Sequence, residues 1–437
     1  METKKLKREI SLSGALSTVM GTVIGAGVFF KAAAVASHTQ SAGLALFAWL
    51  LAGFLTICGG LTVAELATAI PKTGGAIQYI EATYGKLPAF LLGWAQSIIY
   101  FPANIAALSI IFATQLINLF DLDANILVPA AIVTAISVTS INLLGTRVAA
   151  RVQSLTLVIK LLPIFAIVLF GLFTAGDVNV SLVNLKTGDN QSWLVGFSGA
   201  LLATLFAYDG WLNVGNVAGE MKNPVKDLPR AIILGLSFVT LIYWLINFAF
   251  FKFLPVEQVS GNLNAASEVA VMLFGKAGGK IVTIGILISV YGALNGYTMT
   301  GIRVPYALAL QNDFRFSAML TKLTRRTYVP LVATLLQLGI GCGMIVIGSF
   351  DLLTDMLVFV MWFFSLLIFL AVFILRKKHP ELKRHYKVPL YPLTPLIAIF
   401  GGLFILVMTT ITQPYLVLAG IGLTLLGIPV YYFGKSK

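Results

Sequence analysis

The stretch Gly21-Thr22-Val23-Ile24-Gly25-Ala26-Gly27-Val28-Phe29 interrupts an apolar run that begins near Leu12 and ends near Ala36. Its three glycines weaken a helix, because each costs roughly 1 kcal/mol relative to alanine. In lipid, such a break persists only where protein or a polar ligand takes up the freed N–H and C=O groups. The pattern predicts an unwound segment that binds a small zwitterion with a carboxylate and an ammonium. The alternative is close helix packing through the GxxxG pair of Gly21 and Gly25.

The composition is that of a polytopic membrane protein. The 437 residues are 58% hydrophobic and 11% charged, whereas a soluble domain has about 25% charged residues. The net charge of +13 would suggest nucleic acid in a soluble protein. Here the basic residues cluster in short loops, so no nucleic-acid partner is expected. Cys58 and Cys342 lie in apolar runs and imply no disulfide framework.

Apolar runs of about 20 residues recur along the chain and predict an all-α fold with twelve transmembrane helices in the lipid bilayer. The prediction is one transmembrane domain, 1–437. The predicted spans are about 11–36, 42–69, 87–119, 126–145, 152–174, 193–218, 230–254, 272–309, 329–348, 353–375, 391–411 and 414–433.

The loop charges predict the orientation of the spans. Lysine and arginine cluster before the first span, after every second span and after the last. Because basic loops stay in the cytoplasm, both termini are expected to be cytoplasmic, in a multi-pass protein of the cell membrane. The outer side is predicted to carry only Lys31, Lys186, Lys252, Lys276 and Lys280.

A second break, Phe206-Ala207-Tyr208-Asp209-Gly210-Trp211, interrupts the sixth span. An aspartate at this depth is costly unless it faces a polar interior. The sixth span follows the first by five, so the two groups of five spans cross the membrane in opposite senses. Two interrupted helices at equivalent places in inverted halves indicate a transporter's substrate site. The expected units are repeat one at about 11–174, repeat two at about 193–375 and peripheral helices at about 391–433.

These motifs carry a family resemblance. GTVIGAGVF at 21–29 resembles the first-helix motif of the amino acid–polyamine–organocation superfamily. FAYDGW at 206–211 and GEMKNPVKDLPRA at 219–231 are similar to the L-type amino acid transporter family, and to its bacterial serine/threonine or alanine–serine–cysteine exchanger type. The resemblance implies a LeuT-like fold, a 5+5 inverted repeat with helices one and six unwound at the midplane. It also implies amino acid exchange by alternating access.

Animal members of this family carry a cysteine between spans three and four that links them to a heavy subunit. The loop from Phe120 to Asn125 has no cysteine. No disulfide-linked heavy subunit is therefore expected, and the protein is expected to function as a monomer.

The resemblance also implies a set of substrate-binding residues. The substrate carboxylate is expected to meet the backbone N–H groups of Gly25, Ala26 and Gly27, where the positive end of an outer half-helix would begin. The amino group is expected to meet backbone carbonyls. The residues assigned to these carbonyls and to the rest of the site are Val23, Ile24, Phe206, Ala207 and Asp209.

Three side chains beside the second break have two interpretations each. Phe206 is either the outer gate over the substrate or an ordinary aromatic in a helix interface. Trp211 either borders the pocket or packs between helices. Asp209 either selects basic amino acids or binds local backbone donors.

Lys160 is a charged residue within the fifth span. Eight residues beyond Val152, it would lie roughly 12 Å deep by helix rise, near the middle of a hydrocarbon layer of about 30 Å. We expect its ammonium to bind the carbonyls around Met20 to Val23, as sodium does in related symporters, and Ser289 to complete the contact. Snorkelling to the surface is the alternative. Tyr243 in the seventh span matches a tyrosine that the family has near the inner half of the first span. The alternative is that Tyr243 only packs between helices.

The favoured function is a sodium-independent antiporter of small neutral L-amino acids such as alanine, serine, threonine and cysteine. The alternatives are a proton-coupled or cationic amino acid transporter, a channel and an intramembrane enzyme. An enzyme would need paired catalytic groups, and the sequence offers only Asp209 and Lys160 at depth. With no P-loop and no metal-ligand spacing, no catalytic residue, cofactor or metal site is expected.

Overall fold

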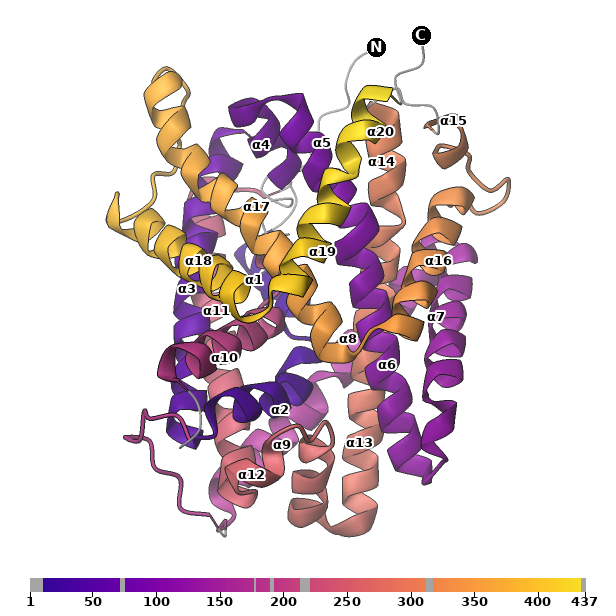
Figure 1. Cartoon of the computed structure of the whole chain (residues 1–437), viewed down its shortest axis with the longest axis vertical. Coiled ribbons are helices and arrows are strands. Elements are labelled where there is room, and N and C mark those ends of the chain that lie inside the picture. The colour runs from indigo at the N-terminus through magenta and orange to yellow at the C-terminus, as the bar shows by residue number, and fades with distance from the viewer. Residues whose placement is uncertain are drawn as a thin grey trace.

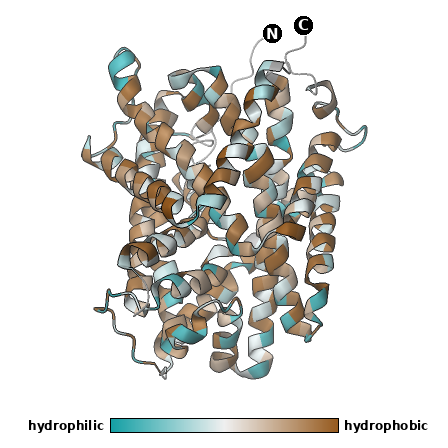
Figure 2. Cartoon of the chain, in the orientation of Figure 1, coloured by the Kyte–Doolittle hydropathy of each residue, from teal (hydrophilic) through white to brown (hydrophobic). Residues whose placement is uncertain are grey.

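The protein is described by a computed structural model, which covers residues 11–70, 75–176, 178–188, 192–212, 221–311 and 317–433. This part of the chain is all-α, and most helices run along the long axis of the molecule (Figure 1). Hydrophobic residues predominate along the helices (Figure 2).

The first half of the chain begins with a helix broken in its middle. α1 (Leu12–Val23) and α2 (Gly27–Thr39) meet at a bend of 47° over the predicted glycine-rich segment. The following elements are α3 (Ala42–Ala69), α4 (Ala76–Tyr84), α5 (Lys86–Ala95), the π turn η1 (Gln96–Tyr100), α6 (Phe101–Phe120), the 3₁₀ turn η2 (Ala124–Ile126), α7 (Leu127–Leu143), α8 (Thr146–Ile159) and α9 (Leu161–Phe173).

The second half begins with α10 (Trp193–Ala207), which ends at the second predicted break. The elements after it are α11 (Pro224–Phe253), α12 (Val256–Val259), α13 (Ala265–Gly301), α14 (Arg303–Gln311), α15 (Ser317–Leu320), α16 (Leu331–Ile347), α17 (Phe350–Lys378), α18 (Leu393–Thr412), α19 (Pro414–Leu425) and α20 (Gly427–Phe433).

By length and composition, nine helices of the described residues can cross a membrane, or ten if the bent pair of α1 and α2 counts as one span. α10 and α16 are shorter apolar helices within two further predicted spans. The last part of the predicted sixth span, 213–218, and Gly219 and Glu220 of the loop motif lie outside the described residues.

The fifth predicted span differs from expectation in two ways. Its helix α8 begins at Thr146 rather than near Val152, and α8 stops at Ile159, so that Lys160 separates it from α9. Pro163 follows three residues later. Because proline lacks the N–H that would bond back to residue 159, it weakens the helix at this point.

The two breaks lie against each other in the core. α10 packs against α2, α3 and α17, while α1 packs against α11. The approach at the breaks is close enough to require glycine. A Cβ on Gly27 would lie 2.6 Å from the Cα of Ala207, and one on Gly210, whose φ is +99°, would lie 2.7 Å from the Thr22 carbonyl oxygen. The paired breaks therefore form one packed unit.

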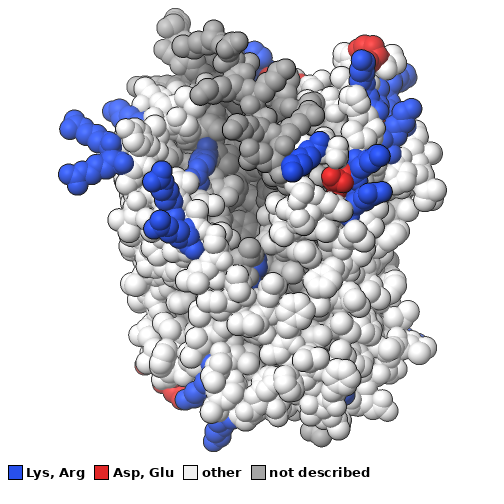
Figure 3. Space-filling model, turned by 180° about the vertical axis from the view of Figure 1, so that it is seen from behind, with Lys and Arg blue, Asp and Glu red and all other residues white. Residues whose placement is uncertain are grey.

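Charged residues are distributed unevenly over the surface. In Figure 3, most of the visible Lys and Arg side chains lie toward the end that carries α4 and α20 in Figure 1. A smaller group lies at the opposite end, and the middle of this face is almost free of charge. The pattern is that of a band surrounded by hydrocarbon with a more basic end.

A buried carboxylate joins α3 to α17 near the basic end. Glu65 is 1% exposed. Its two oxygens accept hydrogen bonds of 2.8 and 2.6 Å from the Arg376 guanidinium, and Oε2 also accepts one of 2.8 Å from the Val388 N–H. Such a bidentate, fully bonded pair fixes the geometry of the two helices.

Candidate functional site

A cavity of about 270 Å³ lies at the junction of the two helix breaks. Its wall contains nine of the predicted site residues, namely Val23, Ile24, Gly25, Ala26, Gly27, Lys160, Phe206, Ala207 and Asp209. The rest of the wall comes from α1, α6, α8, α13 and the α10 end, with Gly21, Thr22, Phe101, Leu108, Gln153, Gly210, Ala293, Gly296, Tyr297, Met299 and Thr300. Backbone groups of the first break and the charged groups of Lys160 and Asp209 thus share one cavity.

Lys160 binds the broken end of α1. Its Nζ donates to the carbonyl oxygens of Gly21 at 2.8 Å and Ile24 at 2.6 Å, and the residue is 5% exposed. These carbonyls carry the partial negative charge of a helix C-terminus, which an ammonium stabilises. The contact therefore ties α1 to the junction of α8 and α9 and does not fit the snorkelling alternative.

Tyr243 of α11 joins the two breaks. Its hydroxyl lies 2.9 Å from the Val23 carbonyl oxygen and 3.0 Å from that of Ala207. Tyr243 is fully buried and is absent from the cavity wall among the described residues. It therefore acts behind the break rather than inside the cavity.

Asp209 is held by two side chains that sequence patterns did not indicate. Its Oδ2 accepts hydrogen bonds from the hydroxyls of Tyr100, at 2.5 Å, and Tyr297, at 3.1 Å. Tyr100 ends the π turn η1, a rare geometry that often marks functional sites. The one available sequence signal was Pro102 inside the third span, since proline disturbs a helix one turn before itself.

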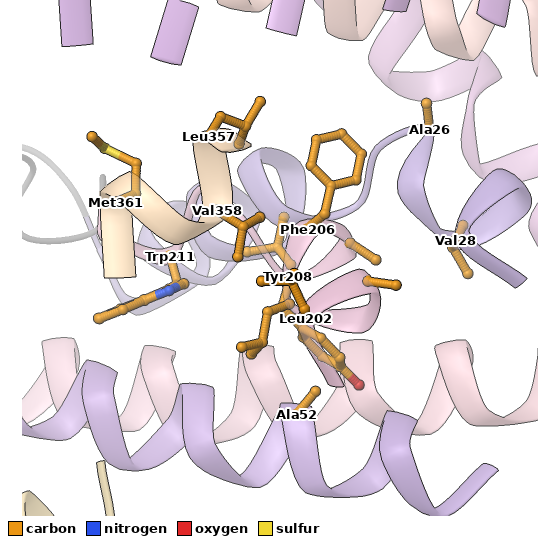
Figure 4. Close-up of a cluster of buried hydrophobic side chains, with 14 of the residues drawn as sticks. Ala26, Val28, Ala52, Leu202, Phe206, Tyr208, Trp211, Leu357, Val358 and Met361 are labelled. Carbon is orange, nitrogen blue, oxygen red and sulfur yellow. The ribbon is translucent and has the colours of Figure 1, made fainter. Parts of the chain in front are cut away.

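Phe206 lies on one side of the α10 end, opposite Tyr208, which points toward α3 near Ala52 (Figure 4). The Phe206 ring packs edge-on against Phe350, with centroids 5.8 Å apart. It is 6% exposed and covers the cavity on the side of α2 and α17.

Lys31, which was predicted among the basic residues of the outer side, is fully buried in α2. Its Nζ lies 2.7 Å from Asp351 Oδ1 and 3.2 Å from Asp355 Oδ1, both on α17. The same ammonium lies 5.5 Å from the Phe206 ring and 5.0 Å from the Phe350 ring. A charge cluster therefore joins α2 to α17 directly beside Phe206.

Two predicted residues lie away from the cavity. Trp211 stacks on Phe369 at 6.0 Å and contacts Trp362 at 6.5 Å, and these contacts favour the packing interpretation. Ser289 is buried, and its Oγ has no hydrogen-bond partner among the described residues. The predicted contact of Ser289 with Lys160 is therefore not formed in this structure.

Within the described ranges, no group of three or more His, Cys, Asp or Glu side chains could hold a metal ion. The polar groups of the cavity are instead backbone amides and carbonyls, one ammonium, one carboxylate and hydroxyls. This set suits a small polar solute that contacts an irregular backbone, as transporter sites do.

A broken first helix with a polar cavity at its break is the site of a membrane transporter. Residues 10–429 match the family model described as amino acid permease. The chain belongs to the amino acid permease family, whose members are transporters rather than enzymes. The resemblance drawn from the two helix motifs is thereby confirmed.

Curated relatives cover the chain almost completely. It is 42% identical to the serine/threonine exchanger SteT of Bacillus subtilis (strain 168) over 437 residues, which are 100% of this chain and 99% of the relative. It is 30% identical to the human cystine/glutamate transporter over 99% of this chain and 86% of the relative. The Asc-type amino acid transporter 1 of Mus musculus is also 30% identical, over 99% of this chain and 82% of the relative.

Lys31→Met should destabilise the protein by about 3–5 kcal/mol, because the buried Asp355 carboxylate loses its cation. Adding Asp355→Leu should restore much of the loss, since apolar replacement of a buried ion pair is often neutral. Thermal unfolding in detergent measures both effects. The control is Lys280→Met, at an exposed position of α13. A single Lys31→Met variant as stable as this control would show that the cluster does not hold α2 to α17.

Proposed function

We propose that the protein is a sodium-independent exchanger of small neutral L-amino acids, such as alanine, serine, threonine and cysteine, in the cell membrane. It would work by alternating access, with both termini in the cytoplasm. The observation that carries the proposal is the Lys160 ammonium bound to the carbonyl end of α1 beside the cavity.

Lys160 supports sodium independence. A cation at the carbonyl end of α1 stabilises that end electrostatically. An ammonium within the protein supplies this charge and three donors permanently. No ion then has to bind or leave in each cycle, so transport gains nothing from a sodium gradient. Exchange against an internal amino acid is the natural mode of such a carrier.

The cavity supports a small amino acid. Its volume of about 270 Å³ lies below the roughly 300–1,000 Å³ typical of pockets for drug-sized ligands. We propose that the substrate carboxylate binds the amides of Gly25, Ala26 and Gly27, at the positive end of α2. The amino group would bind carbonyls of Val23, Phe206 and Asp209. The relatives named for serine, threonine and Asc-type transport support the same substrate class.

The proposed architecture has twelve spans in a LeuT-like 5+5 inverted repeat. Repeat one is 11–174, repeat two is 193–375, and 391–433 is peripheral. The 47° break between α1 and α2 and the end of α10 at Ala207 support it, since they meet at one cavity. Phe206, with Lys31 and Phe350 beside it, would be the outer gate. Lys160 and Tyr243 would couple this site to the inner half of the first helix.

The proposed partners are the substrate amino acids and the lipid bilayer. We propose that the protein works as a monomer without a disulfide-linked heavy subunit. Cys58 is buried in α3, which is consistent with this proposal, and Cys342 lies within α16.

Asp209 supports one second candidate, a proton-coupled or cationic amino acid transporter of the same fold. Its carboxylate faces the cavity and could attract a cationic side chain or a proton.

The test is counterflow with purified protein in liposomes loaded with unlabelled serine. Uptake of labelled serine should require internal amino acid and should be equal in sodium and choline buffers. Alanine, serine, threonine and cysteine should inhibit it strongly, and tryptophan and arginine weakly. Sodium-stimulated uptake would contradict the proposal. Arginine exchange without serine exchange, or proton uptake with the substrate, would establish the second candidate.

Gly25→Val should abolish serine binding without unfolding the protein. A Cβ at Gly25 meets only the Val23 carbonyl oxygen, at 3.8 Å, so the added side chain blocks the cavity rather than a helix contact. Gly27→Val is a poorer test, because it would collide with Ala207. Gly422→Val is the matched control, since a Cβ there meets nothing within 4 Å on α19. Normal serine binding by folded Gly25→Val protein would rule out the backbone site.

Lys160→Met should slow serine exchange about tenfold or more, since charged hydrogen bonds contribute about 1.5–3 kcal/mol each. The control is Lys252→Met. Lys252 also donates to helix-end carbonyls, those of Gly171 and Leu172, and none of these residues belongs to the described cavity wall. Initial rates of counterflow measure both variants. Full exchange by Lys160→Met, or an equal loss in both variants, would contradict the coupling role.

A further inference from the structure

The carboxylate of Asp209 is the only acidic side chain among the described residues of the cavity wall. It follows the end of α10 and is partly exposed to the cavity. Tyr100 and Tyr297 approach it from two other elements, η1 and α13, and both donate to Oδ2.

No ion pair of the described residues includes Asp209. The cavity's ammonium, on Lys160, bonds instead to two carbonyl oxygens. A buried carboxylate needs partners for its lone pairs, and hydroxyls provide them without neutralising its charge. The Asp209 carboxyl group therefore has hydrogen-bond partners within the protein while it faces the proposed substrate cavity.

We infer that Tyr100 and Tyr297 determine specificity, because their hydroxyls hold the Asp209 carboxylate against η1 and α13 and away from a substrate's side chain. The inference rests on the proposed function and explains how a cavity with an aspartate takes neutral amino acids. A cationic side chain would have to displace two hydrogen bonds, one of them only 2.5 Å long. The two hydroxyls thus favour neutral substrates, and without them the Asp209 carboxylate would attract a cationic side chain.

The rings themselves are held independently of the hydroxyls. Tyr100 packs edge-on against Phe101, with centroids 4.9 Å apart, and against Tyr297 at 6.0 Å. Phenylalanine at both positions keeps these contacts and removes only the donors. The Asp209 carboxylate then lacks side-chain partners, and a cationic substrate side chain can supply them with a charge-assisted bond.

The experiment compares ornithine with serine in counterflow. The measured quantity is the ornithine inhibition constant divided by the serine KM of the same variant. In Tyr100→Phe/Tyr297→Phe this ratio should fall about tenfold or more relative to the unmodified protein. Adding Asp209→Asn should reverse the fall. Tyr291→Phe is the matched control, because this α13 hydroxyl bonds to Ser137, 3.0 Å away, and lies outside the cavity wall.

An unchanged ratio in the folded double variant overturns the inference. A fall that persists with Asp209→Asn also overturns it, since the carboxylate would not be the cause. If the double variant does not fold by gel filtration, Tyr297→Phe alone, which removes the longer bond, must lower the ratio at least threefold.

The proposed function fails separately if the unmodified protein does not exchange serine. In that case, thermal-shift titration of the purified proteins with ornithine decides the inference. A gain of ornithine binding in the double variant supports it, and no gain overturns it.

Discussion

The structure depends on the contact between the Lys160 ammonium and the carbonyl end of α1. A helix that stops within a membrane leaves carbonyls that lipid cannot solvate, so a break without a partner would be unstable. Lys160 donates to the Gly21 and Ile24 oxygens, and Tyr243 bonds to the Val23 oxygen. Because these partners come from α8–α9 and α11, the broken helix is stable only while it rests on its neighbours. These contacts keep the irregular backbone at the proposed substrate site in place.

Charge pairs fasten α17 at two levels. Toward the basic end, Arg376 of α17 binds Glu65 of α3, and beside Phe206 Asp351 and Asp355 of α17 bind Lys31 of α2. The first pair joins two long continuous helices, and the second joins a continuous helix to half of a broken one. Removing the Lys31 charge therefore weakens the hold of α17 on the outer half of the broken helix.

Local sequence patterns predicted the breaks, the approximate helix positions and nine of the twenty residues of the cavity wall. A cluster of glycines that weakens a helix, or an aspartate within an apolar span, can be recognised from a few neighbouring residues. Gly25 and Asp209 could therefore be predicted as site residues before any fold was known. Apart from the α1 carbonyls that Lys160 binds, partners from distant elements could not be predicted. Tyr100 and Tyr297 reach Asp209 only after three elements pack, and Lys31 is buried because two aspartates 320 and 324 residues away face it. The predicted contact between Ser289 and Lys160 is also not formed, because the rotational position of α13 could not be predicted from the sequence.

The central claim is that an internal ammonium, rather than a bound ion, holds α1 in place. Hydrogen–deuterium exchange of the α1 amides in unmodified and Lys160→Met protein tests it most directly. We expect strong protection in the unmodified protein, equal with and without sodium, and a large loss of protection over 12–23 in the variant. Equal protection in both proteins, or protection that depends on sodium in the unmodified protein, would contradict the account.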